Sequence, residues 1–170
     1  MSKTKKLVFA ALLAALSYGA TVALMVPSPT GGYMNLGDAV GLLGAFLLGP
    51  GYGALAGAIG PALADLLSGY VVYVPGTLVI KGMMALAAAW LYRLLGKTGR
   101  AAAVGAAAAE TIMVVGYWLY DGIFLLGSLA GSAAGIPSNL MQAVFGALVG
   151  MALAAALRRS VYVRREFPEL

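Results

Sequence analysis

The sequence predicts an all-α membrane protein with six transmembrane helices, and three observations lead to this prediction. The chain of 170 residues is 62% hydrophobic and only 10% charged, with a mean hydropathy of +0.93, which is too apolar for a soluble domain. Apolar segments alternate with short breaks rich in glycine and proline. Ten of the eleven basic residues lie in three groups that fall on one side of a six-span arrangement.

The expected helices belong to one membrane domain covering residues 1–170. They lie approximately at 7–26, 36–48, 52–68, 77–95, 101–120 and 137–157, and a basic cytoplasmic tail follows at 158–170. The first segment is long enough to cross a hydrocarbon core of about 30 Å and does not have the pattern of a cleaved signal peptide. The second segment is short for a full span.

The first helix follows a cationic head and is rich in alanine. Ala10 with Ala14, and Ala11 with Ala15, have the four-residue spacing that lets another helix approach closely. This spacing serves either internal packing or the docking of another subunit.

A loop follows the first helix, because prolines and then two glycines interrupt the chain between Val26 and Gly37. We expect this loop on the outer side. Asp38 comes in the first turn of the next helix, where the helix dipole alone is a sufficient reason for a carboxylate.

The third helix carries a stripe of small residues at Gly53, Gly57, Gly60 and Ala64, which predicts close packing against another helix. Pro61 is expected to kink this helix.

The next connection brings a carboxylate and an ammonium into otherwise apolar sequence. Asp65 ends the third helix and Lys81 lies in the fourth, with Tyr70 and Tyr73 between them. Charges at membrane depth usually face a protein interior or a cavity, so this stretch is expected to form one wall of a site. Three alternatives remain for Lys81: snorkelling to the interface, pairing with Asp65, or contact with a ligand.

The fifth and sixth helices add inward-facing polar groups. Glu110, Tyr117 and Asp121 share one face of the fifth helix at offsets of 7 and 11 residues. Asn139 and Gln142 lie one turn apart on the sixth helix, where amides form either interhelical hydrogen bonds or ligand contacts.

The basic residues predict the orientation. The head, the turn after the fourth helix and the tail hold all of them except Lys81, so both termini are expected in the cytoplasm. The segment from Gly122 to Gly135 is then an extracellular loop or a partial helix, because a seventh span would place the four arginines of the tail outside.

Several kinds of chemistry are excluded by composition. The chain has no cysteine and no histidine and only six acidic residues, so we expect neither a metal site nor a bound cofactor. Gly96-Lys97-Thr98 is similar to the end of a phosphate-binding loop, but the leading glycine is replaced by Leu91. The positive charge lies beside apolar helices, which argues against a nucleic-acid partner.

The order of these segments resembles the substrate-binding S components of energy-coupling factor (ECF) vitamin transporters. The resemblance rests on P-S-P-T-G-G-Y-M-N-L-G-D from Pro27, L-L-G-P-G-Y-G from Leu47, A-L-A-D-L-L-S-G-Y ending at Tyr70, I-K-G from Ile80 and I-P-S-N-L-M-Q from Ile136. It implies a capture subunit, not an enzyme, in a prokaryotic plasma membrane. It also implies a vitamin site near the outer face and a separate transmembrane scaffold subunit driven by two ATPase subunits, docked on the alanines of the first helix.

The expected substrate-binding residues come from the first loop, from the connection between the third and fourth helices, and from the fourth to the sixth helices. They are Tyr33, Asn35, Tyr70, Tyr73, Lys81, Glu110, Tyr117, Asp121, Asn139 and Gln142, and the expected docking residues are Ala10, Ala11, Ala14 and Ala15. The expected pocket has no tryptophan, which favours a vitamin B6 form or the hydroxymethyl pyrimidine precursor of thiamine over riboflavin. The alternatives are an intramembrane enzyme that uses buried carboxylates and a stand-alone proton-coupled carrier.

Overall fold

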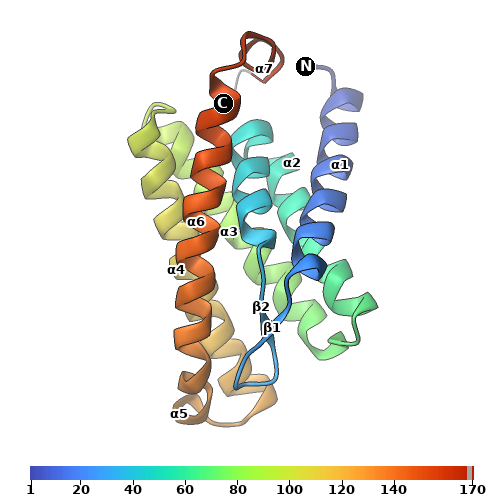
Figure 1. Cartoon of the computed structure of the whole chain (residues 1–170), viewed down its shortest axis with the longest axis vertical. Coiled ribbons are helices and arrows are strands. Elements are labelled where there is room, and N and C mark those ends of the chain that lie inside the picture. The colour runs from blue at the N-terminus through green and yellow to red at the C-terminus, as the bar shows by residue number, and fades with distance from the viewer. Residues whose placement is uncertain (168–169) are drawn as a thin grey trace.

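The computed structural model describes residues 1–167 and 170 as a bundle of helices (Figure 1). The long helices are α1 (Lys3–Ala23), α2 (Gly37–Leu67), α3 (Val74–Leu94), α4 (Gly99–Tyr120) and α6 (Ile136–Arg158). Each of these five lies in a stretch long and apolar enough to cross a membrane. The structure therefore confirms the predicted class of helical membrane protein.

Helix α2 consists of two helical halves that run back along each other. Gly49 has φ 77° and ψ −173° and is the residue in α2 with non-helical dihedrals, so the chain reverses there between residues 37–48 and 50–67. A Cβ atom on Gly53 would lie 2.7 Å from Cα of Ala45, and one on Gly57 would lie 3.7 Å from Cα of Gly41. The two halves are the second and third helices predicted from the sequence, and the expected kink at Pro61 stays a prediction.

The glycine stripe of the second half of α2 brings three elements close together. Gly53 contacts the first half of α2, and Gly57 packs beside Ala85 of α3. A Cβ atom on Gly60 would lie 2.4 Å from the carbonyl oxygen of Ala14 in α1. The stripe therefore packs closely, as predicted, and it serves several neighbours because its residues share one face but lie at successive levels along the helix.

The irregular elements gather at the end of the bundle opposite the termini (Figure 1). They include the antiparallel strands β1 (Val26–Pro27) and β2 (Tyr33–Met34) and the 3₁₀ turn Val71–Tyr73. After α4 come a π-helical turn at Asp121–Leu125, the short helix α5 (Leu129–Ser132) and a 3₁₀ turn at Ala133–Gly135. The last three elements are the partial helix that the sequence allowed between the fifth and sixth spans.

The two termini meet at the other end of the bundle (Figure 1). Helix α7 (Val161–Glu166) follows α6, and Glu166 forms an ion pair with Lys5 in the cationic head. This pairing lowers the pKa of the Glu166 carboxyl, chiefly through the hydrogen bond from Lys5. Phe167 packs edge-on against Phe9 at 4.8 Å between ring centroids. The described part of the tail is thus held against α1, while Pro168 and Glu169 lie outside the described residues.

Candidate functional site

A cleft lies between the β hairpin and the ends of α2, α3, α4 and α6, away from the termini. Its empty volume, counted together with space open to the outside, is about 450 Å³. It is lined by Ser28, Thr30, Gly32, Tyr33, Asn35, Pro61, Asp65, Tyr73, Thr77, Lys81, Tyr117, Asp121, Asn139 and Gln142.

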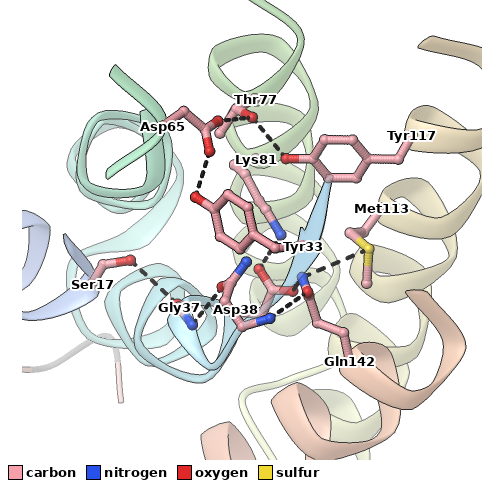
Figure 2. A network of polar contacts seen from close by, with 11 residues as sticks. Ser17, Tyr33, Gly37, Asp38, Asp65, Thr77, Lys81, Met113, Tyr117 and Gln142 are labelled. Carbon is pink, nitrogen blue, oxygen red and sulfur yellow. Dashed lines mark hydrogen bonds and ion pairs between the residues drawn. The ribbon is translucent and has the colours of Figure 1, made fainter. Parts of the chain in front are cut away.

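One side of the cleft is organised around Asp65 (Figure 2). Its two carboxylate oxygens accept hydrogen bonds from the hydroxyls of Tyr33 and Thr77, each at 2.5 Å. The Thr77 hydroxyl lies 2.9 Å from the hydroxyl of Tyr117. Burial, together with the hydrogen bond to Asp65, raises the pKa of the Tyr33 phenol, so this hydroxyl remains a donor. The network ties the hairpin to α2, α3 and α4.

A second network lies deeper and contains a buried ion pair. Lys81 donates to one oxygen of Asp38, and the side-chain amide of Gln142 donates to the other at 2.6 Å. The Lys81 and Asp38 side chains are only 3% and 1% exposed. The Gln142 oxygen accepts a hydrogen bond from the backbone N–H of Asn35 at 2.8 Å. Both oxygens of the buried carboxylate thus have partners, as such a charge requires.

The local sequence explains how these groups meet. The side-chain oxygen of Asn35 accepts from the backbone N–H of Gly37 at 2.8 Å, a local turn that leads from the hairpin into α2 just before Asp38. Thr77 and Lys81 are four residues apart and therefore share a face of α3. Lys81 also lies 5.4 Å from the centroid of the Tyr117 ring, within range of a cation–π contact.

Tyrosine rings form much of the remaining wall. Tyr73 donates to the carbonyl of Thr30 at 3.2 Å, and its ring centroid is 6.5 Å from that of Tyr117. Tyr33 packs against Tyr70 at 4.6 Å. These rings give the cleft flat apolar surfaces beside hydroxyl groups, which suit a planar ligand with polar edges.

The structure brings most of the predicted substrate-binding residues to this cleft. Those that line it are Tyr33, Asn35, Tyr73, Lys81, Tyr117, Asp121, Asn139 and Gln142. Tyr70 supports Tyr33 from outside the lining. Glu110 is buried next to Gly146 and is not part of the lining; within the described residues, neither of its carboxylate oxygens has a hydrogen-bond partner.

Of the three alternatives for Lys81, the structure excludes snorkelling and pairing with Asp65, and it shows a larger role for Asp38 than expected. Lys81 is buried, so it does not snorkel, and its partner is Asp38, whereas Asp65 is held by hydroxyls. Asp38 does more than complement the helix dipole, because it joins α3 and α6 through Lys81 and Gln142. Sequence reasoning also missed Thr77, although its position one turn before Lys81 was a usable signal.

The alanines of α1 do not form one surface. Ala10 is only 5% exposed and Ala14 is half-buried beneath Gly60, so these two pack inside the chain. Ala11 and Ala15 are exposed on the surface of the bundle. Docking on the alanines of α1 stays a prediction, and the second pair is the one that is accessible to a partner.

A helical membrane bundle with a cleft lined by polar and aromatic side chains at one end has the architecture of a substrate-binding subunit. A solved structure described as "Structure and mechanism of the S component of a bacterial ECF transporter" matches this fold with a TM-score of 0.76, covering 93% of this chain and 98% of that one at 16% identity. The model of the family described as "ECF-type riboflavin transporter, S component" matches residues 1–159. This chain belongs to that family.

A curated relative is also similar to this chain over most of its length. A Pyrococcus woesei protein described as "Uncharacterized protein in gap 3'region" is 33% identical over 142 residues, which is 83% of this chain and 93% of that protein. The match to the family model thus confirms the resemblance noted in the sequence. The chain is a substrate-binding subunit of a vitamin transporter and not an enzyme. Among the described residues, no group of three or more acidic side chains is arranged to hold a metal ion.

Proposed function

We propose that this chain captures riboflavin in the cleft for import. The main support is the match of residues 1–159 to a family described as the S component of riboflavin transporters. The cleft supports it with the aromatic faces of Tyr33, Tyr73 and Tyr117. Tyrosines supply flat area for stacking as tryptophan would, which removes the reason for ranking riboflavin behind vitamin B6 and the hydroxymethyl pyrimidine.

The lining offers partners for the two parts of riboflavin. The edge of its tricyclic ring carries an N–H donor and carbonyl acceptors, and its ribityl chain carries hydroxyls. Asn139 lines the cleft, and a side-chain amide can both donate to and accept from a ligand. A site that pairs with such groups rejects analogues that lack them.

Calorimetry on the purified protein tests the proposal. Riboflavin should bind tightly, while pyridoxine and hydroxymethyl pyrimidine should bind far more weakly. Mass spectrometry of ligand released from protein purified out of riboflavin-supplemented cells provides an independent readout. Tight binding of either smaller heterocycle, with no binding of riboflavin, would show that the smaller heterocycle is the ligand.

Asn139→Ala should weaken riboflavin binding by roughly 1–3 kcal/mol, because a polar group of the bound ligand is left buried without a partner. The same calorimetric titration measures the loss. Thr111→Ala is the matched control: the Thr111 hydroxyl is exposed on α4 and donates to Ala107 of its own helix. Equal affinities in wild type and Asn139→Ala would remove Asn139 from the site.

We also propose that the cleft end faces the outside and that both termini are cytoplasmic. The support is the gathering of the basic head, the turn after α3 and the tail at the terminal end of the bundle. The chain has no cysteine, so single cysteines report cleanly. Pro29→Cys in the hairpin should be labelled by an impermeant maleimide in intact cells, and Arg100→Cys only after lysis. Labelling of Arg100→Cys in intact cells would show that the protein has the opposite orientation in the membrane.

S components of ECF transporters work with a scaffold subunit and ATPases. For this chain we propose one transmembrane scaffold subunit and two ATPase subunits in a prokaryotic plasma membrane. The chain has no complete nucleotide-binding motif, so ATP hydrolysis is assigned to the partners. The exposed pair Ala11 and Ala15 on α1 is the proposed contact with the scaffold.

A further inference from the structure

Asp121 is presented to the cleft by an unusual turn. It begins the π-helical turn Asp121–Leu125, which is closed by a hydrogen bond from the N–H of Leu126 to the carbonyl of Asp121 at 2.8 Å. Gly122 fits tightly against α5, since a Cβ atom there would lie 2.6 Å from Cδ2 of Leu129. Such π turns are frequent at functional sites, and this one sets the direction of the Asp121 side chain.

One oxygen of the Asp121 carboxylate is left unpaired by the part of the chain that the structure describes. The residue is 3% exposed and lines the cleft, and its Oδ1 has no hydrogen-bond partner among the described residues. A buried carboxylate oxygen is costly to leave unpaired and accepts strong hydrogen bonds from N–H and O–H groups. Asp121 is therefore suited to bind a donor group of the ligand.

The charges around the cleft are predominantly negative. The charged side chains in its described lining are Asp65, Lys81 and Asp121, and the ammonium of Lys81 is already paired with Asp38. A phosphate ester, which carries about −1.5 to −2 charges at neutral pH, would meet two carboxylates and no uncommitted cation among these residues.

We propose that the cleft selects the unphosphorylated form of its ligand, with Asp121 accepting a hydrogen bond from the vitamin and, together with Asp65, repelling the phosphate ester. The choice of test ligands rests on the proposed function. The selection also implies a place in a reaction sequence: hydrolysis of a phosphomonoester must precede capture wherever the vitamin is supplied as its phosphate.

Calorimetric titration of riboflavin and riboflavin 5′-phosphate tests this selection. The wild type should bind the phosphate at least about 100-fold more weakly, because like charges brought together in a buried site cost several kcal/mol. Asp121→Asn removes one charge but keeps an acceptor, so it should narrow this ratio by roughly tenfold. Asp121→Ala removes the acceptor and should weaken riboflavin itself by roughly 10- to 100-fold. Equal affinity for both ligands in the wild type, or an unchanged ratio in Asp121→Asn, would overturn the selection.

Three controls separate charge from bulk and from misfolding. Riboflavin 5′-acetate enlarges the same position without a charge and should bind much better than the phosphate; equally strong rejection of both would overturn the charge mechanism. Glu166→Gln removes a carboxylate at the far end of the bundle and should leave the ratio unchanged. Thermal unfolding of each Asp121 variant establishes that it is folded before titration.

Failure of the proposed ligand gives a different result from failure of the selection. If neither flavin binds, riboflavin is the wrong ligand. The ratio of affinities for the unphosphorylated and phosphorylated forms is then measured with pyridoxine and pyridoxine 5′-phosphate, and with the hydroxymethyl pyrimidine and its phosphate. Preference for the phosphorylated member of whichever pair binds would overturn the selection. Preference for the unphosphorylated member, reduced in Asp121→Asn, is the expected result.

Discussion

Replacing Lys81 by methionine should lower the free energy of unfolding by about 3–5 kcal/mol, because removal of one partner leaves the other as an uncompensated buried charge. Asp38 would keep only the hydrogen bond from Gln142, and its side chain is 1% exposed. Methionine has a similar length, so lost packing contributes little to the effect. Denaturation in detergent micelles, followed by circular dichroism, measures the change.

A double variant shows whether the loss comes from the stranded charge. Asp38→Asn with Lys81→Met removes both charges while keeping an acceptor for Gln142, and it should recover most of the lost stability. Lys3→Met is the control for a lysine in the exposed cationic head and should change stability by less than about 0.5 kcal/mol. A Lys81→Met variant as stable as the wild type would show that the pair with Asp38 does not hold the bundle together.

Leucines at both Ala11 and Ala15 should abolish uptake and leave ligand binding nearly unchanged. These alanines are exposed on α1, and small residues at this spacing allow the close helix approach that leucine prevents. The cleft is lined by other elements, so its shape is not altered. Uptake of labelled riboflavin by cells and calorimetry on the isolated subunit measure the two properties separately.

The chain offers a matched control for this change on another helix. Ala103 and Ala107 are also exposed and four residues apart, on α4. Leucines there add the same volume to a surface that no prediction assigns to a partner, so uptake should remain near the wild-type level. If both pairs reduce uptake equally, or if ligand binding falls together with uptake in the α1 variant, the docking role of Ala11 and Ala15 is wrong.

The sequence by itself determined the class of protein and much of its outline. Hydropathy and helical periodicity are local properties of the chain, so the apolar spans, the break around Gly49 and the inward face containing Tyr117 and Asp121 could be derived without coordinates. The gathering of basic residues at the end with the termini follows from the same local pattern. The order of short motifs identified the family that the comparisons then showed.

Only the tertiary structure decided which residues meet. From the sequence, Asp65 was the carboxylate considered as a partner for Lys81, but the structure pairs Lys81 with Asp38. The reversal at Gly49 brings the start of α2 beside α3, while Asp65 accepts hydrogen bonds from Thr77 and Tyr33. The two alanine pairs of α1 are shifted by one position along the sequence, which corresponds to a rotation of about 100° around the helix. Which pair faces inward depends on packing against Gly60. Ion-pair partners and helix rotation result from contacts distant in sequence, so a local pattern does not contain them.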